Sequence, residues 1–230
     1  AGGDDNIFLG QDAGKCYQAG EFNIAIGTQA LCGKGSDSTG WCNIAIGHLA
    51  GANNCTGSRS IMMGHRAMLC HRTGYFNVAM GECAGRGSHT NSDGGTGSYN
   101  FFLGRYSGYE HTTTNHAVYI GDLVGRHGTT TSCSVMIGGK AGYNNTTGNN
   151  NILIGFEAGC GVTDGTVMSE NIMIGALSGI SNLTGDRNVF LGHSAGNTNT
   201  SGCCNVAIGY NVELPSASSN NQMAIGSDTS

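Results

Sequence analysis

The phrase N-I-A-I-G occurs at residues 23–27 and again at residues 43–47, and variants of it recur along the whole chain. Its general form is Asn, apolar, any residue, apolar, Gly. The glycines that end the phrase, here called the repeat glycines, are Gly10, Gly27, Gly47, Gly64, Gly81, Gly104, Gly121, Gly138, Gly155, Gly175, Gly192, Gly209 and Gly226. Nine of the spacings between them equal 17, two equal 20 and one equals 23. The unbroken repeat predicts a single domain over residues 1–230.

The residues three and one before each repeat glycine are apolar in all thirteen copies, as Ile24 and Ile26 are. Many are β-branched, and in a strand the two positions share a face. The spacings are too long for hairpin turns, and the Gly-, Asn- and Thr-rich connections do not favour helix. The sequence therefore predicts an all-β fold, a parallel β-solenoid of 13 coils with a 17-residue basic period. Coils stacked about 4.8 Å apart would form a rod of about 60 Å.

Two further positions of the phrase lead to structural predictions. The opening Asn is expected to form a hydrogen-bonded ladder from coil to coil. The residue two before the repeat glycine is apolar in every copy, as in Phe102 and Phe190. A single apolar strand per coil encloses little core, so we expect another copy of the chain to cover these residues. The sequence thus predicts a homo-oligomer without fixing its order.

Composition excludes several classes of protein and partner. The chain has 41 glycines but one proline, which excludes collagen, and its apolar content of 38% with a net charge of −5 argues against disorder. Ten scattered Lys and Arg residues form no basic stripe, so we expect no nucleic-acid partner. No apolar stretch approaches about 20 residues, so we expect no membrane insertion. The fifteen acidic residues form no catalytic pattern, and we expect neither enzymatic activity nor a cofactor or metal.

Ten cysteines without a C-x-x-C pair indicate an oxidising, extracellular setting, with buried thiols as the alternative. Cys16 and Cys32 lie at similar positions of adjacent coils and are predicted to form a disulfide, with Cys55 and Cys70 as a weaker pair.

The sequence also contains candidate modification and ligand positions, each with two interpretations. Asn-x-Ser/Thr signals occur at Asn54, Asn144, Asn145, Asn182 and Asn199. They indicate either an N-glycosylated edge or a turn consensus. His48 and His65 directly follow consecutive repeat glycines, which fits a metal site or an ordinary surface. Threonines at 112–114, 129–131 and 146–147 fit an ice-binding patch or a solvated turn. The insertions near 33–41, 87–98 and 160–169 are expected to bulge outward.

Specific phrases of the repeat resemble known fibre proteins. N-V-A-I-G at 205–209 and Q-M-A-I-G at 222–226 resemble the head repeats of trimeric autotransporter adhesins. N-V-F-L-G-H-S-A-G-N-T-N-T-S-G at 188–202 resembles repeats of phage tail-fibre and chaperone-of-endosialidase proteins. The resemblance covers residues 6–226 and implies a homotrimeric, left-handed parallel β-roll in a surface-exposed fibre.

We therefore expect a structural protein of an extracellular or virion-surface fibre, a shaft or head segment with adhesion as an added task. Its partners would be copies of itself, in a trimer or an end-to-end filament. The main alternative is a receptor- or glycan-binding head on a cell or virion surface. An ice-binding protein and a glycan-cleaving tailspike are further alternatives.

Overall fold

The computed structural model describes residues 3–17, 19–33, 38–88 and 94–227. The chain divides into two compact units, Ala1–His116 and Ala117–Ser230, and each is described by itself. Both consist of the same repeating coil with one three-residue strand, and the described residues contain no helix. The predicted all-β parallel solenoid is therefore confirmed. The single domain over 1–230 stays a prediction.

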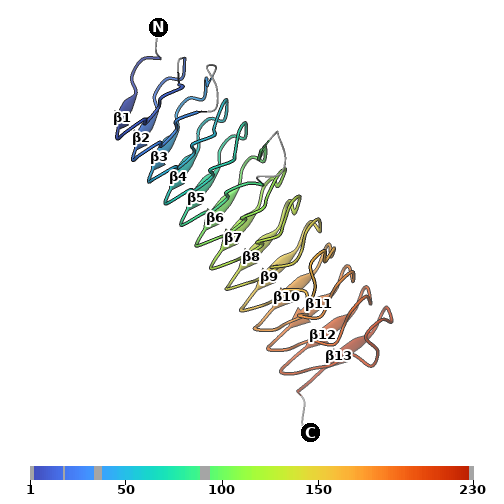
Figure 1. Ribbon diagram of the computed structural model, residues 1–230. Coiled ribbons are helices and arrows are strands. Elements are labelled where there is room, and N and C mark those ends of the chain that lie inside the picture. Colours follow the sequence, from blue (N-terminus) through green and yellow to red (C-terminus); the bar gives the residue numbers. More distant parts are fainter. Residues whose placement is uncertain (1–2, 18, 34–37, 89–93, 228–230) are drawn as a thin grey trace. The chain divides into compact units, whose positions relative to one another are not determined.

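The first unit contains β1 (Ile7–Leu9), β2 (Ile24–Ile26), β3 (Ile44–Ile46), β4 (Ile61–Met63), β5 (Val78–Met80) and β6 (Phe101–Leu103). The second contains β7 (Val118–Ile120), β8 (Val135–Ile137), β9 (Ile152–Ile154), β10 (Ile172–Ile174), β11 (Val189–Leu191), β12 (Val206–Ile208) and β13 (Met223–Ile225). Within each unit consecutive strands pair in parallel, and equivalent residues of the phrase face each other. Figure 1 shows the strands at the same place in successive coils of each unit.

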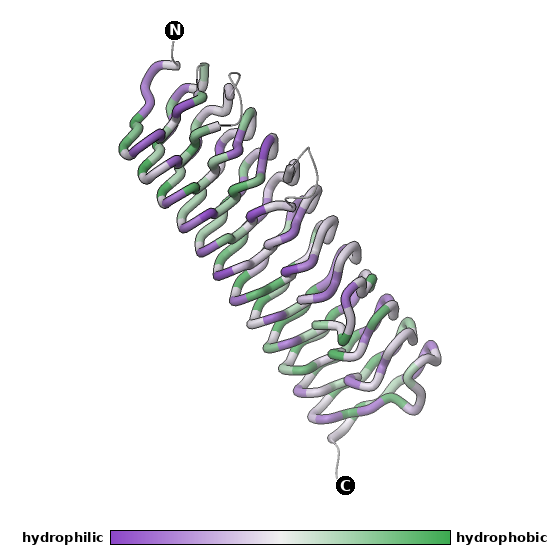
Figure 2. The backbone as a smooth tube through the Cα atoms, in the orientation of Figure 1, coloured by the Kyte–Doolittle hydropathy of each residue, from purple (hydrophilic) through white to green (hydrophobic). Residues whose placement is uncertain are grey.

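The middle residue of each strand points into the coil, and the two flanking residues point outward. From β2 to β12 the middle residue is buried, with Phe102 and Phe190 at 0% exposure. The alanine three residues after the repeat glycine, such as Ala50 or Ala141, lines the same interior and is also buried. Figure 2 shows the hydrophobic residues recurring from coil to coil. The expectation that another chain must cover the middle residues is therefore wrong, because their own coil buries them.

Large and small side chains complement each other within a coil or between neighbouring coils, so that the interior is filled. Tyr119 of β7 lies against Gly125, where a Cβ atom would come within 2.7 Å of the Tyr119 ring. Where the strand supplies only a small residue, Ala25, the equivalent of Gly125 is the fully buried Leu31. In these coils the glycine and the bulky residue complement each other, whereas Gly51, in the coil of Ala45, is met by Met62 and Leu31 of the neighbouring coils.

The repeat glycines lie directly over one another in successive coils. Gly47 has φ +131°, and a Cβ atom on it would lie 2.7 Å from the carbonyl oxygen of Gly64. The same close approach joins Gly121 to Gly138 and Gly138 to Gly155. Only glycine combines this backbone conformation with so close a neighbour. The predicted alignment of the repeat glycines within each unit is confirmed.

The buried asparagines that open the strands form the predicted ladder. The backbone N–H of Asn43 donates to Oδ1 of Asn23 at 2.9 Å, and Nδ2 of Asn23 donates to the Gly40 carbonyl at 2.9 Å. The same backbone-to-Oδ1 bond joins Asn23 to Asn6, Asn100 to Asn77, Asn171 to Asn151, Asn188 to Asn171 and Asn205 to Asn188. Ser60 and Ser134 take the place of Asn in two coils, and their hydroxyls accept the next backbone N–H. Most coils are therefore tied to the next by the side chain at this position as well as by strand pairing.

Of the three predicted outward loops, two include residues 34–37 and 89–93, which lie outside the described residues. In the third, residues 162–165 are exposed, as predicted. Met168 differs, because it is fully buried and its methyl group lies beside Gly159. The insertion therefore bulges outward only in part, because Met168 packs back into the core.

Candidate functional site

The outer sheet face, formed by the residues three and one before each repeat glycine, is apolar throughout. Most of its side chains are half-buried, and Leu103, Ile152 and Ile174 are more than a third exposed. No polar residue occupies either position in any of the thirteen copies. With strands of three residues stacked about 4.8 Å apart, each unit presents about 300 Å² of this face. Each face by itself lies at the lower end of the range for the largest apolar patch of a typical monomer, roughly 300–600 Å².

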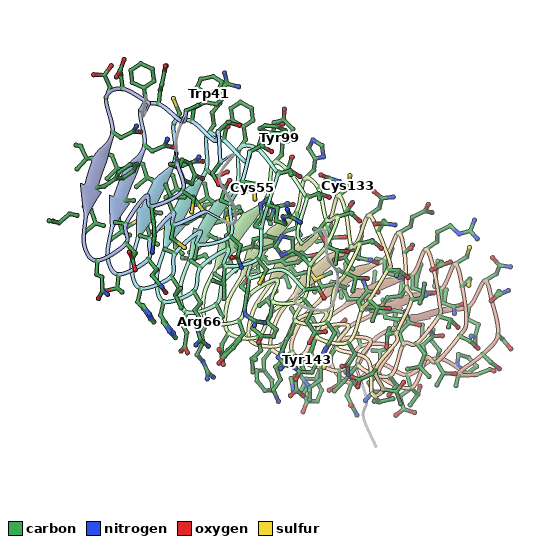
Figure 3. All side chains as sticks on the ribbon, turned by 45° about the horizontal axis from the view of Figure 1, so that its top comes forward. Trp41, Cys55, Arg66, Tyr99, Cys133 and Tyr143 are labelled. Atoms are coloured by element: carbon green, nitrogen blue, oxygen red, sulfur yellow. The ribbon has the colours of Figure 1, made fainter. Side chains whose placement is uncertain are left out.

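A second exposed feature, which the sequence analysis missed, is the ring column of the first unit: Trp41, Arg59, Phe76, Tyr99 and His116. The Arg59 guanidinium carbon lies 3.9 Å from the Trp41 ring centroid and 5.1 Å from that of Phe76. Phe76 stacks on Tyr99 at 5.2 Å, and Tyr99 stacks on His116 at 5.0 Å. Tyr99 is 54% exposed and Trp41 is 40% exposed. Figure 3 shows both projecting from the same edge, whereas Arg66 lies on another edge.

The signal for this column was present in the sequence. Arg59, Phe76, Tyr99 and His116 each lie five residues before a repeat glycine, and Trp41 lies six before one. The periodicity of this position places the side chains of successive coils above one another.

A buried histidine pair lies inside the first unit. The rings of His71 and His111 stack with centroids 5.2 Å apart, and Phe102 lies 5.0 Å from His111. Nδ1 of His111 donates to the Gly108 carbonyl at 3.0 Å. Burial, together with the neighbouring His111, lowers the pKa of His71 to about 3, and burial lowers the pKa of His111 to about 4. Both imidazoles are therefore neutral at physiological pH.

His48 and His65, the candidate metal ligands of the sequence, lie exposed at the surface of the first unit. His48 and His65 stack at the surface with ring centroids 5.3 Å apart, and Nδ1 of His65 lies 3.9 Å from Oε1 of Glu82. Within the part of the chain that the structure describes, no group of three or more His, Cys, Asp or Glu side chains could hold a metal ion. The same residues contain no helix with the length and hydropathy of a membrane span.

The asparagines of the glycosylation signals lie inside the turns. Asn54, Asn144, Asn145, Asn182 and Asn199 are all buried. Nδ2 of Asn182 donates to the Gly185 carbonyl at 2.8 Å, while the Gly185 N–H donates to Oδ1 of Asn182 at 2.9 Å. These contacts support the turn interpretation of N-x-T-G. Glycosylation at the five asparagines stays a prediction. The sugar would have to be attached to the side-chain Nδ2 atoms, which are buried in the folded coil.

The ten cysteines are thiols in this structure. The Cys16 N–H donates to the Cys32 carbonyl at 2.9 Å, which places these two residues in adjacent coils as expected. The Cys32 thiol donates to the Ala52 carbonyl at 3.2 Å, and the Cys55 thiol donates to the Asn53 carbonyl at 3.5 Å. The disulfides Cys16–Cys32 and Cys55–Cys70 remain predictions about the oxidised protein.

The threonines of the second unit bond to the backbone. Oγ1 of Thr129 donates to the Thr146 carbonyl at 3.0 Å, and Oγ1 of Thr146 donates to the Thr166 carbonyl at 3.2 Å. Thr131 is buried, and its hydroxyl bonds to that of Tyr119. These bonds favour a structural turn ladder over an ice-binding surface.

Comparisons with protein-family models, curated proteins and solved structures gave no match for this chain. The interpretation of its function therefore rests on the two exposed features, the outer sheet face and the ring column.

Proposed function

We propose that the chain is a structural protein of an extracellular or virion-surface fibre, in which copies assemble through the outer sheet face. The observation that carries this proposal is the unbroken apolar character of that face, which the coil itself buries only in part. In a monomer these two columns of apolar side chains, which run from coil to coil, would remain in contact with water and add no stability.

The energy available from this face is of the same order as the cost of association. At about 25 cal/mol per Å², covering about 300 Å² contributes about 7 kcal/mol for each unit of the chain. Two units contribute about 15 kcal/mol, against an association cost of roughly 4–15 kcal/mol before side-chain ordering. Burial of the whole face is therefore needed for a stable complex, which favours an extended contact along the coils.

The finer assignments rest on the resemblance to adhesin heads and tail fibres. They are a left-handed coil, a homotrimer, and a place on a cell or virion surface as a shaft or head segment. Joining of such trimers end to end would give a filament. The chain then acts as a spacer without enzymatic activity, and its length is set by the number of coils.

The test measures the mass of the folded protein in solution by light scattering at micromolar concentration. The outer-face double variant Ile44→Asp/Ile137→Asp changes one residue of each unit. The control Asn150→Asp changes an exposed residue just before β9. We expect a trimer for the wild type and the control, and a folded monomer for the double variant. A monomeric wild type, or a double variant that assembles like the wild type, would contradict the proposal.

A receptor- or glycan-binding head is the second candidate function, and the ring column favours it. Exposed aromatic residues beside an arginine are common in binding surfaces. The two functions are compatible, because a fibre segment can present its ligand site on an edge that assembly leaves open.

A further inference from the structure

We propose that the ring column of Trp41, Arg59, Phe76, Tyr99 and His116 is a binding site for a linear acidic glycan. The proposal goes beyond the structural role of a fibre, and it does not depend on the oligomeric state of the chain.

The fold does not require rings at this position. In the second unit the residues five before the repeat glycines have the same exposure and the same backbone conformation, with φ between +54° and +60°, and none of them is aromatic. They are Cys133, Asn150, Glu170, Arg187, Cys204 and Asn221. A left-handed conformation disfavours bulky side chains and suits Asn. Phe76 and Tyr99, at φ +55° and +61°, therefore need an explanation other than coil geometry.

The ring column is held in place before any ligand arrives. Its members contact one another along the stacking direction, from Trp41 through Arg59 and Phe76 to Tyr99 and His116. Aromatic side chains have few rotatable bonds, so binding would immobilise little that is not already ordered. The members come from five coils, and four steps of about 4.8 Å give a site about 19 Å long.

The chemistry of the column fits an acidic sugar chain. Ring edges and partly open faces can pack against the C–H groups of sugar rings. The indole N–H of Trp41, the Tyr99 hydroxyl and the Arg59 guanidinium supply hydrogen-bond donors, and Arg59 suits a carboxylate or sulfate. No carboxylate occupies positions five or six before the repeat glycines between Trp41 and His116. The acidic residues of these positions in the first unit, Asp4, Asp5 and Glu21, lie before the column.

The width of the site favours a chain-like ligand over a folded protein. A specific protein interface covers about 800 Å² on each partner. The ring column is one side chain wide, with Tyr75 beside Phe76 as its exposed flank. An extended polysaccharide that lies along the coils can contact every member at once.

The experiment uses the full chain and measures its retardation in native gels that contain a soluble polysaccharide. Polygalacturonate supplies carboxylates, dextran sulfate supplies sulfates, and hydroxyethyl cellulose is the neutral comparison. We expect retardation by at least one of the acidic polymers, with an apparent affinity at least tenfold above that for the neutral one. Absence of retardation by both acidic polymers, or equal binding of the neutral polymer, would overturn the proposal.

The variants separate the rings from the charge. Phe76→Asn/Tyr99→Asn should weaken acidic-polymer binding at least tenfold, while the fold is kept because Asn tolerates the left-handed backbone conformation of both positions. Arg59→Gln should weaken it about fivefold or more. The matched control Arg187→Gln removes an arginine from the same position of a coil in the second unit, and it should bind like the wild type. If Phe76→Asn/Tyr99→Asn bound like the wild type, or if Arg187→Gln lost as much binding as Arg59→Gln, the polymer would bind outside the ring column and the proposal would be wrong.

The same samples distinguish this proposal from the fibre function. Ring-column variants should keep the wild-type mass in light scattering, and the outer-face variant Ile44→Asp/Ile137→Asp should keep polymer binding per chain. If the outer-face variant alone abolished polymer binding, the site would depend on assembly and the ring column as proposed here would be wrong.

Discussion

At the scale of single residues, the side chain of one asparagine satisfies two backbone groups of the next coil. Asn188 accepts the Asn205 N–H at 2.9 Å through Oδ1, and its Nδ2 donates to the Gly202 carbonyl at 2.9 Å. Its own N–H donates to Oδ1 of Asn171 at 2.9 Å. Because the side chain is fully buried, no water can replace these bonds. The repeated Asn of the sequence therefore has a structural role in joining the coils.

We expect Asn188→Ala to lower the free energy of unfolding by about 2 kcal/mol, because it leaves the buried Asn205 N–H without a partner and removes one of the two hydrogen bonds to the Gly202 carbonyl. Asn188→Ser should cost about half as much, since Ser60 and Ser134 show that a hydroxyl can accept the next N–H. Urea unfolding followed by circular dichroism measures both. Equal losses for Ala and Ser would contradict this account of the ladder.

The buried histidine pair makes a prediction about pH. The pKa values of His71 and His111 are lowered to about 3 and about 4, whereas both would be near 6.5 in the unfolded chain. The unfolded chain therefore binds more protons as the pH falls below about 6.5, and the stability of the folded chain decreases. Between pH 7 and pH 4.5 we expect a loss on the order of 3–5 kcal/mol from the pair, measured as a shift in the urea midpoint.

The control for this prediction comes from the repeat itself. Asn54 and Asn182 lie seven residues after their repeat glycines, the position that His71 and His111 occupy in their coils. His71→Asn/His111→Asn should therefore fold and show a much flatter dependence of stability on pH. If the variant lost as much stability as the wild type, carboxylates and not the histidines would be responsible for the acid sensitivity.

At the scale of the strand, the direction of each side chain determines its role. In β6 the adjacent residues Phe101 and Phe102 point to opposite faces, the first half-buried on the outer sheet face and the second fully buried. Sequence patterns predicted the strand and its parallel neighbours, because the phrase repeats without a phase error. They did not predict which face is internal, because apolar residues occupy both.

This pair gives a direct test of side-chain direction. Phe102→Ala should lower the free energy of unfolding by about 3–5 kcal/mol, the range for a phenylalanine removed from a packed core. Phe101→Ala should cost the isolated chain only about 1 kcal/mol but weaken its association. Denaturation and light scattering on both variants measure the two effects. A larger unfolding effect for Phe101 would reverse the assignment of inner and outer faces.

The sites were less predictable than the strand. The buried asparagines of the turns match the glycosylation signal in sequence. Only the structure, in which their Nδ2 atoms are buried, favours the turn interpretation. The ring column was missed because its members lie a whole coil apart in the sequence and are of different residue types. Contacts between Arg59 and Trp41 follow from the stacking of coils, which a scan of local motifs does not detect.

At the scale of the whole molecule, the repeat predicts that a complete coil can be removed. Deletion of residues 189–205 takes out one full period of the repeat and brings β12 next to β10 in the register of the other pairs. We expect a folded β protein with cooperative unfolding at a slightly lower urea midpoint. Deletion of residues 189–204 retains one extra residue before the strand and displaces the ladder asparagine, so it should lower the midpoint much further. Equal midpoints would show that the exact length of the period is not essential.

The asparagine ladder also has a consequence for how the chain is made. Its bonds join residues 17 apart, as in Asn188 and Asn205, and at most 23 apart, as in Asn77 and Asn100. A nascent chain can therefore add each coil to the one before it as soon as that coil has left the ribosome, without waiting for distant sequence. The first coils serve as the template for the later ones, and synthesis and folding advance together from the N-terminal end.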